Sequence, residues 1–213
     1  MNEQASGKAT PNLWCQIWSA LRAPTARYSL GGLLLVGIVA GVMGWGAFNW
    51  ALEITNTQTF CVTCHEMEQN VFREFTGTVH DTNKSGVRAT CPDCHVPRDW
   101  IHKVRRKIQA SNELFHHVLG TIDTREKFEA KRLTMAKSVW QSMKETDSRE
   151  CRNCHDFQAM DITRQASRAR QRHLDAVGEG KTCIDCHKGI AHKLPKGAFG
   201  AEQELNETWG AKK

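Results

Sequence analysis

The chain has 213 residues, and 40% of them are hydrophobic. Its mean hydropathy is −0.51 and its formal net charge is +6. This length fits one domain with an appendage. The basic excess is small and scattered, so it does not indicate a nucleic-acid partner. The chain also contains nine cysteines and ten histidines, and their spacing carries most of the functional information.

The first predicted element is the uncharged stretch 28–52, which lies between Arg27 and Glu53. A helix of this length exceeds the hydrocarbon thickness of about 30 Å, so it can cross a membrane with some tilt. A cleaved signal peptide is the alternative, but its apolar run would be shorter and would end at a small-residue cleavage site. Basic residues outnumber acidic ones in residues 1–27, which predicts a cytoplasmic N-terminus and a periplasmic location for residues 53–213.

Eight of the nine cysteines belong to four Cys-x-x-Cys-His motifs, and Cys15 is left as a free thiol. The motif residues are Cys61, Cys64 and His65; Cys91, Cys94 and His95; Cys151, Cys154 and His155; and Cys183, Cys186 and His187. In c-type haem attachment, two sulfurs bond to one porphyrin and the next histidine reaches the iron. Zinc sites and disulfides explain paired cysteines but not a histidine after every pair. The sequence therefore predicts four covalently bound haem c groups.

The motif spacing repeats along the chain, with His80 between the first two motifs and His173 between the last two. This repeat predicts two di-haem halves, at about 53–120 and 121–195. Four six-coordinate haems need four axial ligands beyond the motif histidines. The candidates in order of preference are His80, His173 and His192 together, then His102, and last the pair His116 and His117. Met67 is either an alternative to His65 as a ligand or a residue that packs against the porphyrin.

The rest of the chain predicts helices and no convincing strand. Residues 98–120 fit an amphipathic helix with a basic first half that faces either solvent or anionic lipid headgroups. Asp123 is the expected cap of the next helix, a third helix covers about 157–177, and the tail 196–213 is expected to be loose. The expected fold is mainly α, with one N-terminal transmembrane helix and a haem-cored multihaem cytochrome c domain (53–195) that has little β structure.

The chain resembles the NapC/NirT/NrfH family in its anchor, in CVTCHEM, CPDCH, CRNCH and CIDCH in that order, and in RKIQASNELFHHVLGTIDTREKFE (106–129). The resemblance runs from the anchor to about Pro195 and is closest to NapC-like and NirT-like members. It implies an inner-membrane tetrahaem cytochrome that oxidises quinol beside its first haem. The electrons would pass to a periplasmic terminal reductase or its cytochrome subunit, most simply a nitrate or nitrite reductase.

The resemblance also implies residue roles. The methionine matching Met67 ligates the first haem in NrfH-type members, whereas NapC-type members are thought to use two histidines. The histidine matching His80 serves a haem other than its own. Acidic and lysine side chains after the second motif lie near the quinol, in a stretch that here contains Asp99, Lys103, Lys107 and Glu113.

Quinol oxidation releases two protons, so titratable groups must accept them, and Glu53, Asp99 and Glu113 are the candidates. Two other functions stay open. The chain could be a passive anchored electron shuttle without a quinol site. A haem-based nitrite or hydroxylamine reductase would need an open iron position, and the chain has no Cys-x-x-Cys-Lys motif to suggest one. A homodimer also stays open.

Overall fold

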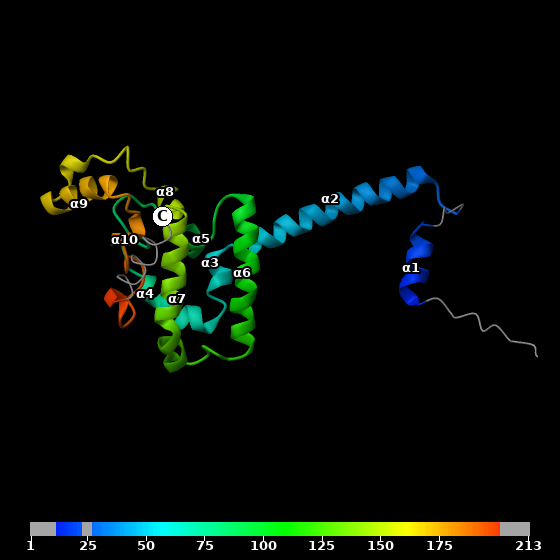
Figure 1. The fold of residues 1–213 in the computed structure, drawn as a ribbon, viewed down its shortest axis with the longest axis horizontal. Helices are drawn as coiled ribbons and strands as arrows, with labels where there is room; N and C mark the ends of the chain where they lie inside the picture. Colours follow the sequence, from blue (N-terminus) through cyan, green and yellow to red (C-terminus); the bar gives the residue numbers. More distant parts are fainter. Residues whose placement is uncertain (1–11, 23–26, 201–213) are drawn as a thin grey trace, which may run out of the picture. The chain divides into compact units, whose positions relative to one another are not determined.

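The computed structural model describes residues 12–22 and 27–200, and within these ranges it contains helices and loops but no strand. The mainly α fold expected from the sequence is therefore confirmed for the described part. The chain divides into two compact units, Met1–Asn49 and Trp50–Lys213 (Figure 1). Most of the predicted cytoplasmic segment 1–27 and of the predicted tail 196–213 lies outside the described residues.

The first unit contains helix α1 (Leu13–Arg22) and most of helix α2 (Leu30–Ile54). Within α2, the stretch Gly31–Ile54 has a mean hydropathy of 1.9, and none of its most apolar 18 residues is buried. At about 1.5 Å per residue, this helix is long enough to cross a bilayer core of about 30 Å. The predicted span 28–52 is therefore found as a helix, displaced by two residues.

The second unit begins with the last turn of α2 and contains two long helices among many short ones. The long helices are α6 (Trp100–Val118) and α7 (Arg125–Glu145). The short ones are α3 (Gln58–Cys61), the π-helix η1 (Met67–Phe72), α4 (Arg73–Phe75), α5 (Cys91–His95), α8 (Arg149–Arg152), the 3₁₀-helix η2 (Ile162–Arg164), α9 (Ser167–Gly178) and α10 (Cys183–Cys186).

Two of the expected helix starts need correction. Thr124, not Asp123, caps α7, because its hydroxyl accepts a hydrogen bond from the backbone N–H of Lys127 at 3.3 Å, while Asp123 forms an ion pair with the Lys127 side chain. The helix expected over 157–177 begins only at Ser167. Just before it, the Asp161 carboxylate accepts from the backbone N–H of Thr163, and such local bonds compete with helix formation.

The hydrophobic core of the second unit lies between α7 and α10. Trp140, Ile184 and Ala198 are buried there, and three partly buried apolar residues of α7 pack against them. Those residues are Leu133, Ala136 and Met143. Ala198, which belongs to the segment expected to be a loose tail, is only 5% exposed, whereas its neighbours from 196 to 200 are exposed.

A buried ion pair joins the two sequence halves beside this core. The Arg132 guanidinium donates to both carboxylate oxygens of Glu74, at 2.9 Å to Oε1, and to the backbone oxygen of Lys193 at 2.7 Å. Both side chains are 9% exposed. Burial disfavours a charged Glu74, but the hydrogen bonds from Arg132 and Lys193 outweigh it and hold the pKa of this carboxyl below its usual value.

Candidate functional site

The four cysteine motifs lie on short helical turns. The second and fourth motifs begin in the same way, with a capping box in which Thr90 pairs with Asp93 and Thr182 pairs with Asp185. In each box the aspartate accepts hydrogen bonds from the backbone N–H and the hydroxyl of its threonine. This local bonding forms the turn from the chain's own residues, so the positions of the cysteines follow from the sequence Thr-Cys-x-Asp-Cys-His.

The motif helices are neighbours in space in the order in which they occur along the chain. Helix α3 contacts α5, and α5 contacts α8. The Cys61 and Cys91 thiols share a hydrogen bond that lowers the pKa of Cys61 to about 7. Burial raises the pKa of Cys151, and the nearby Cys183 thiol raises it further. The four motifs therefore form a continuous series within the second unit.

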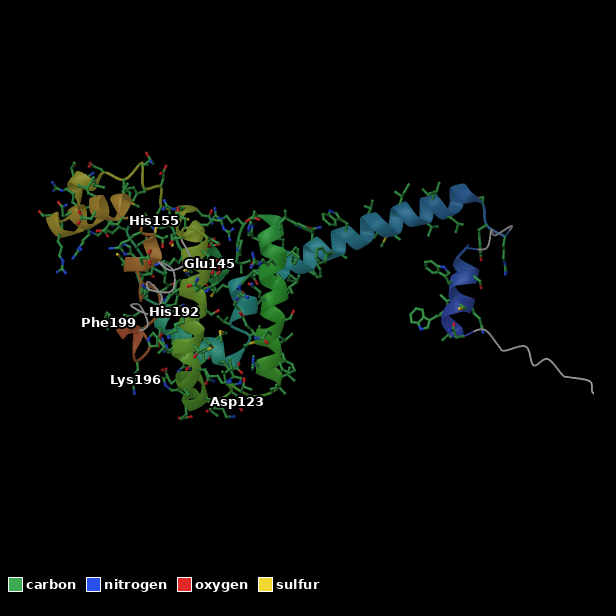
Figure 2. All side chains as sticks on the ribbon, viewed as in Figure 1. Asp123, Glu145, His155, His192, Lys196 and Phe199 are labelled. Atoms are coloured by element: carbon green, nitrogen blue, oxygen red, sulfur yellow. The ribbon has the colours of Figure 1, made fainter. Side chains whose placement is uncertain are left out.

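Every motif histidine faces a second histidine from elsewhere in the chain. The ring centres are 6.1 Å apart for His65 and His117, 6.2 Å for His95 and His192, 6.2 Å for His155 and His80, and 5.9 Å for His187 and His173. Figure 2 labels His155 and His192 among the side chains. A histidine nitrogen binds a transition metal at about 2 Å and the ring centre lies roughly 1 Å further back, so two axial rings have centres roughly 6 Å apart. All four pairs have this spacing.

Two of the four histidine pairs join the two sequence halves. His80 lies in the first half but faces His155 of the third motif, and His192 lies in the second half but faces His95 of the second motif. The first and fourth motifs take partners from their own halves. The two predicted di-haem halves are therefore interlocked through their histidines.

The second ring nitrogen of the partner histidines meets different acceptors. Nδ1 of His117 lies 2.7 Å from Oε1 of Glu66, Nδ1 of His173 lies 2.6 Å from Oε1 of Gln165, and Nδ1 of His192 lies 3.1 Å from the backbone oxygen of Val71. Nδ1 of His80 is buried and has no hydrogen-bond partner in the described structure. An acceptor at Nδ1 fixes the tautomer that leaves Nε2 free for a metal.

Burial also keeps several of these imidazoles neutral, which is the form that binds a metal. It lowers the pKa of His95 to about 4, with His192 and Arg106 adding to the shift. The pKa values of His187 and His192 are lowered for the same main reason. Metal binding needs the neutral ring, so these environments favour the ligating form near neutral pH.

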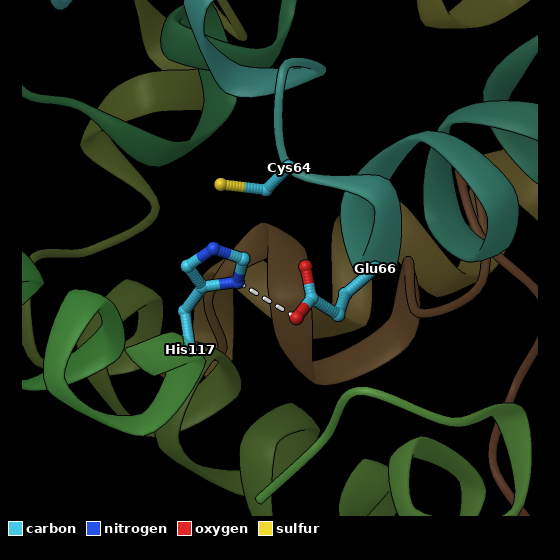
Figure 3. A group of neighbouring side chains, drawn as sticks. All are labelled: Cys64, Glu66 and His117. Carbon is cyan, nitrogen blue, oxygen red and sulfur yellow. Dashed lines mark hydrogen bonds and ion pairs between the residues drawn. The ribbon is translucent and has the colours of Figure 1, made fainter. Parts of the chain in front are cut away.

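A buried carboxylate lies beside the first histidine pair (Figure 3). Glu66 is 2% exposed, and its Oε1 also lies 3.5 Å from Nε2 of His65. One ligand atom from each of Cys64, Glu66 and His117 falls within 4.8 Å of the others, which by itself would allow a bound metal ion. Two of these residues belong to the motif and histidine pair of the first site, so the cluster is part of that site.

The histidine pairing differs from the expected order of preference at one position. His102, which the sequence ranked above His117, has its Nδ1 2.5 Å from Oδ1 of its own helix cap, Asp99. His117, ranked last together with His116, is the residue that faces His65. Met67 begins η1 and is half-buried. The ligand roles of His102 and Met67 stay predictions.

The residues expected near a quinol fall into separate places in the second unit. Glu53 Oε1 and Lys103 Nζ form an ion pair at 2.6 Å and line a cavity of about 290 Å³, together with Asp93 and Arg98. Lys107 Nζ instead donates to the backbone oxygen of Thr55 at 2.7 Å.

The other two expected residues do not line this cavity. Asp99 accepts from His102 and lies 3.6 Å from Arg149. Glu113 pairs with Arg106 at 2.7 Å. Of the five expected residues, only Glu53 and Lys103 therefore line this cavity, and Lys107 lies close to both of them.

The protein core is small for a unit of this length. Among the described residues, the buried hydrophobic side chains are Leu52, Phe75, Phe128, Trp140, Ile184 and Ala198. Protein interiors are closely packed, so a core this small fits a domain whose interior is completed by bound groups with large apolar faces. This observation and the four histidine pairs fit four haem groups.

Comparison with known proteins identifies the family of the chain. The NapC/NirT cytochrome c family, N-terminal region, matches residues 23–197. The chain belongs to this family. It is a c-type cytochrome with several Cys-x-x-Cys-His motifs, and haem c is the cofactor that this family implies.

The relatives of this NapC/NirT cytochrome cover most of its length. The denitrification system component NirT of Stutzerimonas stutzeri is 60% identical over 181 residues, 85% of this chain and 90% of the relative. The cytochrome c-type protein NapC of Escherichia coli K12 is 54% identical over 185 residues, 87% of this chain and 92% of the relative. The cytochrome c-type protein TorC of the same strain is 44% identical over 193 residues, 90% of this chain but 49% of the relative. No solved structure matched.

Some residues of the NapC/NirT cytochrome's site were missed by sequence reasoning. Glu66, Gln165 and Asp93 were not singled out, and His117 was placed last. The capping boxes had a readable signal in the repeated Thr-x-x-Asp. Glu66 and Gln165 had none, because each contacts a histidine brought to it by the fold.

Proposed function

We propose that the chain is a tetrahaem c-type cytochrome, anchored in the inner membrane by α2, that oxidises membrane quinol and passes the electrons to a periplasmic nitrate or nitrite reductase system. The observation that carries this proposal is the set of four facing histidine pairs, each with one member in a Cys-x-x-Cys-His motif. Membership of the NapC/NirT family supports it, since two relatives carry the names NapC and NirT.

The cysteines of each motif would hold one haem, and one histidine pair would bind the iron of each haem. When bound, the haems supply single-electron acceptors and donors. The chain's own contribution is the arrangement of the motifs in a continuous series, α3 beside α5 and α5 beside α8. The bond from the carboxylate of Glu66 to His117 and that from the amide of Gln165 to His173 orient two of the ligand rings.

The quinol site is proposed in the cavity beside the end of α2. Glu53 and Lys103 line it. Glu53 is one residue from the end of the membrane-spanning stretch, a depth that the ring of a lipid-soluble quinol can reach. The Lys103 ammonium can donate a hydrogen bond to a quinol oxygen. The Glu53 carboxylate, 64% exposed, can accept a proton at Oε1 or Oε2 and release it to water.

Two other groups near the cavity have structural tasks. The Asp93 carboxylate lines the cavity but is held in the capping box of α5. Hydrogen bonds from Thr90 and Arg98 outweigh the effect of its burial and hold the pKa of Asp93 below its usual value, so it is a poor proton acceptor at neutral pH. Lys107 fixes α6 to the backbone at Thr55. Glu53 is therefore the proposed proton acceptor.

The test uses the full-length mature protein in nanodiscs and measures reduction of its haem absorption bands by an added quinol. The expected result is rapid reduction, slowed about 10²-fold or more by Glu53→Gln, as for the loss of a general base. Asp123→Asn, a surface carboxylate paired with Lys127, is the matched control. If quinol reduced the protein no faster than it reduces a soluble cytochrome in detergent, the protein would be a passive shuttle instead.

A further inference from the structure

Helix α6 carries an apolar stripe that none of the described residues of the second unit covers. The stripe consists of Ile101, Ile108, Phe115 and Val118, and the continuing turn adds Leu119. These side chains are between 56% and 76% exposed. Three of them are seven residues apart, which is two helical turns, so they form a line along the helix over roughly 20 Å. A continuous exposed apolar surface of this kind indicates a binding partner.

The stripe lies on the side of α6 that faces away from the haem sites. At about 100° per residue, His117, Lys103 and Arg106 fall on the side of the helix opposite Ile101, Ile108 and Phe115. Their partners are, respectively, Glu66, Glu53 and the backbone oxygen of His95. Lys107, which donates to the backbone oxygen of Thr55, lies near Val118 at the edge of the stripe. Cofactors bound between the histidine pairs would therefore leave the stripe exposed. The basic face expected to meet solvent or lipid points largely inward instead.

The partner that fits this stripe is the membrane surface. Two contacts tie the first half of α6 to the point where the membrane-spanning stretch ends at Ile54: Lys103 Nζ to Glu53 at 2.6 Å and Lys107 Nζ to Thr55 O at 2.7 Å. The stripe therefore starts beside the site where the chain leaves the bilayer. Arg105 is exposed within it and has no ion-pair or hydrogen-bond partner in the part of the chain that the structure describes.

We propose that α6 is an interfacial helix that lies on the membrane leaflet from which the second unit emerges. The apolar stripe enters the boundary between head groups and acyl chains, and Arg105 pairs with lipid phosphate, as in other helices with one apolar and one cationic surface. This inference rests on the membrane anchoring in the proposed function but not on quinol oxidation. It assigns the second unit a membrane contact of its own, besides α2.

The experiment measures water access to two neighbouring positions in the full-length haem-loaded protein. Cys15→Ser removes the one cysteine outside the motifs, and Ile108→Cys or Gln109→Cys is then added. Gln109 is also exposed but lies about 100° around the helix from Ile108, so it is the matched control. Each variant is placed in nanodiscs that hold one copy each and treated with a bulky polyethylene-glycol maleimide.

The expected result is labelling at position 108 at least tenfold slower than at position 109, because a thiol among acyl chains is shielded from a water-soluble reagent. Equal rates at the two positions would overturn the proposal. So would a position 108 that is protected only in discs holding two copies, which would assign the stripe to a second copy of this chain. The Cys15→Ser parent must stay unlabelled; labelling of that parent would show instead that the haem attachments are incomplete.

The role of Arg105 has a separate readout. In discs of anionic lipid, Arg105→Gln is expected to speed labelling at position 108 several-fold, and in discs of zwitterionic lipid to speed it less. An unchanged rate in anionic discs would contradict the contact with phosphate. Quinol-dependent haem reduction, measured on the same samples, tests the proposed function independently.

Discussion

The two long helices of the second unit have opposite surroundings. Helix α7 buries Phe128, Arg132 and Trp140 against other parts of the chain, whereas α6 buries none of its 19 residues. The inner face of α6 meets histidine sites and the end of α2, and its outer face is bare apolar surface. Helix α7 is therefore stabilised by ordinary protein packing. We infer that α6 depends on groups that the polypeptide does not supply.

The first prediction removes such a group beside α6. With Cys61→Ser and Cys64→Ser together, the first haem cannot be attached. We expect α3 and α6 to become open to proteolysis, since a segment without a protein core opens easily, while α7 and α10 stay protected. Limited proteolysis followed by mass spectrometry locates the cuts, and Cys15→Ser is the control. Full protection of α6 in the double variant would show that it does not depend on this haem.

The second prediction concerns the packing of α7. Arg132→Ala leaves the buried Glu74 carboxylate without its guanidinium partner, and removing one partner of a buried ion pair costs about 3–5 kcal/mol. The measurement is the free energy of unfolding in denaturant. The control is Glu129→Gln, which removes the more exposed partner of the same arginine and is expected to cost about 1 kcal/mol or less. If the two changes lowered the free energy of unfolding equally, the Arg132–Glu74 pair would not be the main stabilising contact of Arg132.

The third prediction separates two histidines of α6. If His117 is the second ligand of the first haem, His117→Ala converts about a quarter of the low-spin haem signal to high spin, and His102→Ala leaves that signal unchanged. Electron paramagnetic resonance of the oxidised protein measures both. The opposite pattern would make His102 the ligand instead, in agreement with the sequence, which ranks it above His117.

The fourth prediction is the smallest. Glu66→Gln replaces a charged hydrogen-bond acceptor at Nδ1 of His117 with a neutral one. A less basic imidazole stabilises the oxidised iron less, so the potential of one haem rises, by about 60 mV if the preference changes tenfold. Spectroelectrochemical titration measures it. Gln165 provides a neutral acceptor to Nδ1 of His173. If Gln165→Ala raised a haem potential by the same amount as Glu66→Gln, the effect would not be specific to the charge of Glu66.

The anchor, the helical class and the family could be predicted from the sequence because each depends on short-range patterns. Residues 28–52 are uncharged over a membrane's thickness, and each Cys-x-x-Cys-His motif places its own histidine beside its own cysteines. The length of α6 was also predictable from its apolar spacing, to within two residues at either end. Local bonding explains the two misplaced helix starts, at Thr124 and Ser167.

The pairing of histidines was less accessible, because it depends on how distant segments meet. His192 and Val71 are far apart in sequence but are joined by a hydrogen bond. His117, which faces His65, lies on α6, and that helix is bonded to Glu53 and Thr55 about 50 residues earlier in the chain. Spacing within a repeat indicated His80, His173 and His192 as ligand candidates. The repeat did not indicate His117, the histidine that faces His65 of the first motif, because the second half of the chain has no histidine at the matching position.

The measurement that tests the account most directly is the intact mass of the mature full-length protein under denaturing conditions. We expect the mass of the polypeptide plus four haem groups, because thioether bonds at all four motifs survive denaturation. A mass with fewer covalent haems, or motif thiols that react freely with alkylating reagents, would contradict it.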